Sequence, residues 1–185
     1  MRYGLCILAL LISPVWAGEY NTRIDTYIKT LQQVAREPVL TRTLMNASHE
    51  CQSLIGILAI EKQWAELSAH ERQIMVSENQ LGYRFRDLIA EPDTDFVEFI
   101  LSSEQGETVA AWPAPSDYWQ GDETKFIQPA MQRKPVVERF DWDESSSSVS
   151  LHISVPVFGQ QGLVIGVLTA GIEVDIASLK DLQIP

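Results

Sequence analysis

The apolar pattern of this chain changes its period once, near Phe96. Before that point apolar side chains recur every three or four residues, which is typical of helices that bury one face. After it, strand-forming residues dominate and apolar positions alternate. A helical half followed by a strand-rich half predicts an α+β fold, with a long N-terminal helix and two further helices packed on a mostly antiparallel sheet.

Three helices are expected in residues 18–90. The first runs from about Gly18 to the interruption at Pro38, because proline removes a backbone donor. The second is predicted to start near Ser48, and the third at Ser68, which forms a capping box with Glu71. The expected apolar stripe of the first helix comprises Tyr20, Ile24, Tyr27, Ile28, Leu31 and Val34. The stripe of the second comprises Cys51, Leu54, Ile55 and Leu58, with Ile57, Ile60 and Trp64 on an adjoining face; that of the third comprises Ile74, Leu81, Phe85 and Leu88.

Strands are expected in residues 96–175, at 96–101, 108–112, 149–157 and 163–174. The last is apolar on both alternating faces, which predicts a central position in the sheet. The serines 145–148 indicate an exposed turn. Alternation in the strand 149–157 places Ser150, His152 and Ser154 on one face. The opposite face, expected to pack on helices, carries Leu151, Ile153, Val155 and Val157.

Residues 1–17 have the pattern of a secretory signal peptide: Arg2, an apolar run from Tyr3 to Ile12, and the cleavage site Val15-Trp16-Ala17. We expect cleavage after Ala17 and a periplasmic location; the alternative is an uncleaved membrane anchor. Residues 18–185 then form a single domain of ordinary size. Cleavage leaves Cys51 without an internal disulfide partner, so it is either buried or available for intermolecular pairing.

Charge and motifs restrict the function. The formal net charge of −11 argues against nucleic acid and against anionic lipid as partners. His49-Glu50 and His70-Glu71 lack the second histidine of a zinc-protease motif, and neither a serine elbow nor a glycine-rich phosphate loop occurs. We therefore expect no metal, no cofactor and no catalytic residues.

The loop 113–123 is the strongest candidate for a binding site, since Ser116–Glu123 combines two aromatics, three carboxylates and a glycine. Pockets for small ligands are mainly aromatic and apolar, with a few polar groups. The alternatives are structural: Asp122 caps the following helix, Asp117 bonds its own turn, Tyr118 closes the sheet edge, and His152 lies on a partly wet sheet face. The predicted ligand-binding residues are Trp112, Asp117, Tyr118, Trp119, Asp122, Phe140 and His152.

Several segments carry a family resemblance: Gly106–Ala110, Ser116–Glu123, Asp143–Ser145, Val155–Val157 and Val164–Leu168. In their order the chain resembles the Cache (PDC) sensor domains, the PAS-like extracytoplasmic modules of bacterial receptors. The resemblance implies a PAS-like sheet and a pocket between that sheet and the loop, opposite the long helix. The Arg-x-Trp-Tyr cluster of the amino-acid-sensing members is missing, so an amino-acid ligand is not expected.

Two classes of function follow from the resemblance. The first is a free-standing module that binds an unknown small organic ligand and signals through a separate membrane receptor, kinase or cyclic-nucleotide enzyme. The expected contact is the N-terminal helix, along which similar domains commonly pair, so a homodimer through that helix is also expected. The alternative is a structural or regulatory interaction protein that keeps the Cache scaffold without a ligand.

Overall fold

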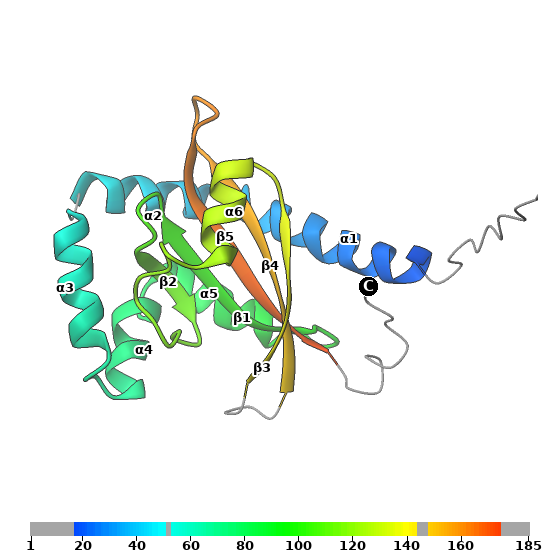
Figure 1. Cartoon of the computed structure of the whole chain (residues 1–185), viewed down its shortest axis with the longest axis horizontal. Coiled ribbons are helices and arrows are strands. Elements are labelled where there is room, and N and C mark those ends of the chain that lie inside the picture. Colours follow the sequence, from blue (N-terminus) through cyan, green and yellow to red (C-terminus); the bar gives the residue numbers. More distant parts are fainter. Residues whose placement is uncertain (1–16, 51–52, 144–147, 175–185) are drawn as a thin grey trace, which may run out of the picture.

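The computed structural model describes residues 17–50, 53–143 and 148–174, with side chains over 23–47, 53–138 and 151–173. The predicted signal peptide, except Ala17, and Cys51 lie outside the described residues. Six helices and five strands follow one another in the described part of the chain (Figure 1). The helices are α1 (Ala17–Ala35), α2 (Pro38–Glu50), α3 (Leu54–Trp64), α4 (Ala69–Ser77), α5 (Gln80–Ile89) and α6 (Thr124–Gln132). The strands are β1 (Phe96–Ser103), β2 (Thr108–Trp112), β3 (Val136–Asp143), β4 (Ser148–Phe158) and β5 (Val164–Val174).

The helical half divides more finely than the sequence predicts. The predicted helix start at Ser48 is wrong, because α2 continues to Glu50 and α3 begins after Ser53, whose hydroxyl accepts a bond from the Gly56 amide. The capping box of Ser68 and Glu71 is confirmed at the start of α4. That helix ends at Ser77, and Asn79 caps a separate α5. At the starts of α3, α4 and α5, a side chain satisfies amides of the first turn.

The predicted apolar stripe of the second helix faces outward. Ile57 and Trp64 of α3 are buried, whereas Leu54, Ile55 and Leu58 are 47%, 81% and 42% exposed. Trp64 packs against the sheet side of the molecule, and its large ring area determines which face of the helix is buried.

The sheet is antiparallel throughout, with strand order β2-β1-β5-β4-β3. The predicted central position of the last strand is confirmed, since β5 lies between β1 and β4. The α+β class is likewise confirmed. Of the predicted serine turn, only Ser148 lies within the described residues, where it begins β4.

Two cores cover the two faces of the sheet. One face packs against α1, α2 and α5, and its β4 residues are the predicted Leu151, Ile153, Val155 and Val157. The other face packs against α3, α4 and the loop 113–123, through Ile57, Trp64, Val76, Ile100, Ala111 and Tyr118. Helix α6 contacts β3, β4 and β5, crossing in front of the sheet while α1 runs behind it (Figure 1).

Among the described residues, no helix is both long enough and apolar enough to span a bilayer.

Candidate functional site

One cross-strand row of the sheet carries charged groups. Glu98 in β1 pairs with Gly171 in β5, which pairs with His152 in β4, which in turn pairs with Glu138 in β3. Directly paired residues share one face of a sheet. The row therefore places two carboxylates and an imidazole on the face opposite α1.

Gly171 leaves room for the contact between its two neighbours. A Cβ added there would lie 3.1 Å from Cβ of Glu98 and 3.4 Å from its Oε2. That same Oε2 lies 3.4 Å from Nε2 of His152, and both side chains are mostly buried. The Glu98 side chain thus reaches across β5 to contact His152. The contact is an ion pair whenever the imidazole is protonated.

The next row of the same face is also polar. Thr169 of β5 pairs with Ser154 of β4, and their hydroxyls lie 2.9 Å apart. Both residues are buried. Because each hydroxyl satisfies the other, this pair costs little to bury.

Two buried polar atoms beside this face lack such a partner. Oγ1 of Thr108 and Oε1 of Gln120 have no hydrogen-bond partner among the described residues, although the amide nitrogen of Gln120 donates to the Asp117 carbonyl at 2.7 Å. The two residues lie on adjoining segments. The backbone amide of Thr108 donates to the Tyr118 carbonyl, and the backbone amide of Gln120 donates to the Gly106 carbonyl. Unpaired buried polar groups are costly, so these two oxygens are available to a water molecule or to a ligand.

Helices α3 and α4 hold the loop 113–123 in place. From α3, Glu61 accepts a bond from the Trp119 amide at 2.8 Å, and Nε1 of Trp64 donates to the Pro115 carbonyl at 3.2 Å. From α4, Oε1 of Gln73 accepts a bond from the Ala114 amide at 2.9 Å. Side chains from two helices thus satisfy loop backbone groups that would otherwise need water. The loop and the α3–α4 pair form one connected unit.

Tyr118 belongs to the core. Its side chain is 7% exposed and its ring lies 5.4 Å from that of Trp64, between centroids. Its hydroxyl is 3.4 Å from Oε1 of Glu107. Burial, and then the nearby Glu107 carboxylate, raise the pKa of the Tyr118 hydroxyl well above its ordinary value. Tyr118 therefore stays neutral and packs as an aromatic residue.

Trp119 is held by its neighbours on both sides. Its Nε1 donates to the Gln105 carbonyl at 2.8 Å. A Cβ at Gly121 would lie 2.4 Å from the ring, and Gly106 adopts a φ of 85° in the turn beneath it. The glycine of the sequence motif is explained by this contact, because any larger residue would displace the indole.

The other predicted site residues lie apart. Trp112 packs against the core on the α1 side, with the Arg86 guanidinium 5.9 Å from its ring centre, so it does not share a wall with Tyr118. Asp117 and Asp122 are exposed. The capping role considered for Asp122 is wrong, since Glu123 is the N-cap of α6 and makes no side-chain cap bond. The side chain of Phe140 lies outside the described residues.

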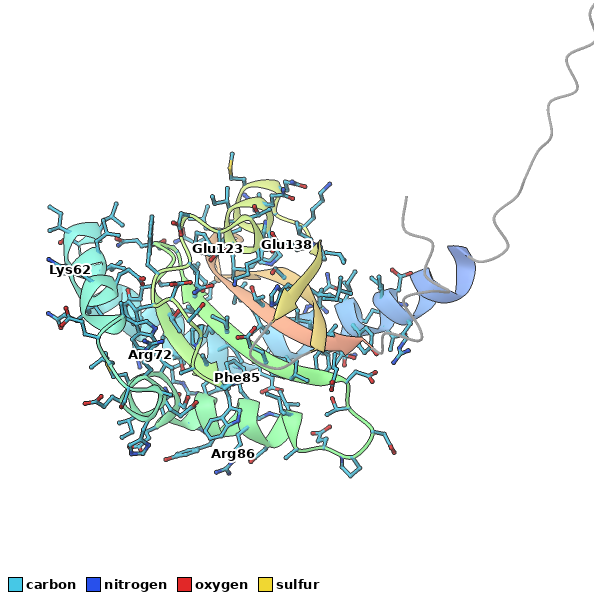
Figure 2. The ribbon with its side chains drawn as sticks, turned by 60° about the horizontal axis from the view of Figure 1, so that its bottom comes forward. Lys62, Arg72, Phe85, Arg86, Glu123 and Glu138 are labelled. Atoms are coloured by element: carbon cyan, nitrogen blue, oxygen red, sulfur yellow. The ribbon has the colours of Figure 1, made fainter. Side chains whose placement is uncertain are left out.

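Figure 2 shows Arg86 of α5 below the sheet and Glu123, just before α6, above it.

Sequence reasoning identified His152 and its face but missed Glu98 and Gly171. The pairing of β1 with β5 brings them together over some seventy residues of sequence, and no local motif encodes that register. Sequence reasoning also missed Glu61 and Gln73, whose side chains accept hydrogen bonds from the loop. Both lie on helices, where polar residues are usually solvated. Among the described residues, no group of three or more His, Cys, Asp or Glu side chains is arranged to hold a metal ion.

The chain is similar to solved sensor domains of bacterial receptors. No family profile matches it. No curated protein matches it either. The sensor domain of the Vibrio cholerae histidine kinase DctB is 12% identical with a TM-score of 0.47, over 91% of this chain and 55% of the other. The ligand-binding domain of the Pseudomonas aeruginosa chemoreceptor PctC, in complex with GABA, is 17% identical with a TM-score of 0.44, over 85% and 67%.

The sensory domain of the Campylobacter jejuni chemoreceptor Tlp3, with isoleucine bound, is 16% identical with a TM-score of 0.43, over 94% of this chain and 69% of the other. This chain thus spans little more than half of the DctB chain and about two thirds of the two chemoreceptor chains. These neighbours are sensor and ligand-binding domains, the class of protein that the sequence resembles. At such identities the similarity gives no residue a role.

Proposed function

We propose that this protein is a Cache-type sensing module that binds a small organic solute on the polar face of its sheet. The observation that carries the proposal is the Glu98–His152 contact across Gly171. Burying a carboxylate against an imidazole costs desolvation that a contact of 3.4 Å does little to offset, so the pair contributes little net stability. A fold that needed only stability would place apolar residues in this row, so we assign the pair to recognition.

The ligand site that we propose lies between this row and the clamped loop. His152 and Glu98 supply hydrogen-bonding groups, and Gln120 supplies a buried free acceptor at the loop. Tyr118 and Trp119 form its aromatic floor, while the exposed Asp117 and Asp122 stand at its rim. Phe140 remains a predicted lining residue. The proposed role is binding and not catalysis.

We further propose export and action through another protein. The signal-peptide pattern before Gly18 supports a periplasmic location; mass spectrometry of the periplasmic protein should find Gly18 at the N-terminus, and intact Met1 in the inner membrane would contradict it. The proposed partner is a membrane receptor, kinase or cyclic-nucleotide enzyme that contacts the exposed polar face of α1. Arg23, Asp25, Lys29 and Gln33 are exposed there.

A polar contact of this kind is transient. Arg23 is already paired with Asp95, so Lys29 is the better position for a crosslinker. Crosslinking from Lys29 in the periplasm should capture a membrane protein. Capture of a second copy alone would indicate the homodimer along α1, and would contradict the hetero-partner.

A second function has one observation in its favour. Tyr118 fills the space beneath the loop and packs on Trp64, as expected of a Cache scaffold that has lost its ligand. The protein would then act only through its surface, as a structural or regulatory interaction partner. A ligand screen distinguishes the two functions.

The deciding experiment is a thermal-shift screen of the purified chain against small organic acids, amines and nucleosides. A ligand at a hundred times its dissociation constant stabilises a protein by about 2.7 kcal/mol. We expect at least one such compound, and we expect its effect to vanish in His152→Gln and Glu98→Gln. The matched control is Met131→Ala, at an exposed position on α6. If no compound stabilises the protein, or if both variants respond like the original, the sensing proposal fails.

A further inference from the structure

The charged row of the sheet selects for positive charge in a ligand. Of its four paired residues, Glu98 and Glu138 carry carboxylates, and His152 is the single group that can become positive. Figure 2 shows Glu138 on the side of the sheet away from Arg86 of α5. A ligand carboxylate in this row meets two like charges, whereas an ammonium group is attracted by both. Neither lysine nor arginine occurs in the next row, which comprises Ile100, Thr169, Ser154 and Val136.

The loop end of the proposed site also requires a hydrogen-bond donor. The side-chain nitrogen of Gln120 donates to the Asp117 carbonyl at 2.7 Å, which fixes the orientation of the amide. The oxygen at its other side, Oε1, is buried without a partner among the described residues, as is Oγ1 of Thr108. A carbonyl oxygen only accepts, so a ligand satisfies Gln120 with an N–H or an O–H group.

The two ends of the site lie on one face of the sheet. Ser102 pairs with Thr108, and it lies four residues after Glu98 in β1, so the three side chains share a face. Four residues of strand span about 13 Å. In the row between, the hydroxyls of Thr169 and Ser154 already bond to one another. A ligand that satisfies both ends is therefore extended, with polar groups at its ends and an apolar middle.

The charged end is the one that a ligand can reach from solvent. The side chains of His152 and Glu98 are 18% and 22% exposed, whereas Gln120 and Thr108 are 2% exposed. The net charge of −11 raises the concentration of cations near the surface of the protein. Both effects favour the approach of an ammonium group to Glu98.

We propose that the solute is an extended organic cation, such as an α,ω-diamine or an amino alcohol. Its ammonium group binds Glu98 beside His152. A second donor at its other end, an amine or a hydroxyl, binds Gln120 and Thr108. The ammonium gives Glu98 a charge-assisted hydrogen bond, which is stronger than the 3.4 Å contact with the imidazole. The assignment of this ligand class rests on the proposed sensing function.

The test is calorimetric titration of the purified chain with diamines and amino alcohols of increasing chain length. Each diamine is paired with the dicarboxylate of the same chain, for example 1,4-diaminobutane with hexanedioate. At least one amine should bind, and the dicarboxylates should not. Glu98→Gln should weaken binding of that amine by about tenfold or more.

The matched control is Glu66→Gln, at an exposed position in the turn after α3. It removes the same charge far from the site, so it should leave the affinity unchanged. An equal loss in Glu66→Gln and Glu98→Gln would mean that the amine responds only to the net charge of the protein, and would overturn the proposal.

Thr108→Val tests the loop end. The substitution keeps the shape of the side chain and replaces an unpartnered buried oxygen by a methyl group, so the melting temperature of the free protein should not fall. The same variant should weaken binding of the amine by about threefold or more. A role limited to the structure would not separate these two measurements. Circular dichroism should show all three variants folded.

The outcomes separate this inference from the sensing function. If acids or nucleosides stabilise the protein and no amine binds, the inference is overturned and the sensing function stands. An amine affinity that Glu98→Gln or Thr108→Val leaves intact overturns the inference as well. If no compound of any class stabilises the protein, the sensing function fails, and the ligand class fails with it.

Discussion

The backbone amide of Trp119 donates a hydrogen bond to Oε2 of Glu61 at 2.8 Å, joining the loop after β2 to the middle of α3. The two residues are far apart in sequence and belong to halves with different hydrophobic periods. Their contact makes the loop part of the helical layer. Predictions about the loop are therefore predictions about α3 as well.

Replacement of Glu61 by alanine should loosen the loop. A hydrogen bond to a charged group contributes about 1.5–3 kcal/mol, and partial exposure of both residues lowers that figure, so we expect a loss of about 1–2 kcal/mol. Urea unfolding measures it, and hydrogen exchange of the Trp119 amide should accelerate. Glu61→Gln keeps an acceptor and should retain most of the stability. Equal losses in the two variants would show that the bond itself is unimportant.

Substitutions of Tyr118 distinguish a role in the core from a role that is limited to lining the ligand site. The sequence assigns Tyr118 and Trp119 to the binding site, which predicts that the fold survives removal of their side chains. The burial of Tyr118 against Trp64 changes that expectation for Tyr118. Tyr118→Ala should cost about 3–5 kcal/mol, as for other buried aromatics.

Tyr118→Phe should cost under about 1 kcal/mol, because the hydroxyl makes only a long bond of 3.4 Å to Glu107. Chemical denaturation of the three proteins gives both differences. A stable alanine variant would remove Tyr118 from the core and return it to the pocket.

Asp95 should make the protein sensitive to acid. Burial raises the pKa of the Asp95 carboxyl. Hydrogen bonds from Tyr27 and Arg23 together lower that pKa by more, so the net pKa lies below the ordinary value. A carboxyl with a depressed folded-state pKa stabilises above its unfolded pKa of about 3.9, and loses that effect as the pH falls through the folded value.

Melting temperatures between about pH 5 and pH 2.5 should therefore fall less steeply in Asp95→Asn than in the original chain. The matched control is Asp93→Asn, at an exposed residue with a φ of 62° that asparagine tolerates. If both asparagine variants follow the original curve, Asp95 does not contribute to acid sensitivity.

Gly171 should control the Glu98–His152 contact. In Gly171→Ala, the new Cβ lies 3.1 Å from Cβ of Glu98, so that side chain must move away from the imidazole. We expect a cost of about 1–2 kcal/mol from overpacking. We also expect a shift of the His152 ring signals in the NMR spectrum, in the same direction as in Glu98→Gln. Unshifted His152 signals would mean that the contact does not depend on the glycine.

The sequence alone determined the features that depend on local spacing. The change of period near Phe96 specified the α+β class, and the apolar run of β5 specified its central place. Ser68 and Glu71 specified a helix start, because a capping box needs only a spacing of three residues. The alternation around His152 specified which face it occupies, because side chains along a strand alternate.

Only the tertiary structure decided which residues meet. Three apolar residues of α3 read as a buried stripe, yet the packing of Trp64 turned Leu54, Ile55 and Leu58 outward. Trp112 and Tyr118, six residues apart, were assigned to opposite cores by the path of the loop. The contact between Glu98 and His152 results only from the register of β1, β5 and β4. Contacts between distant segments depend on register and burial of the whole sheet, which no local pattern contains.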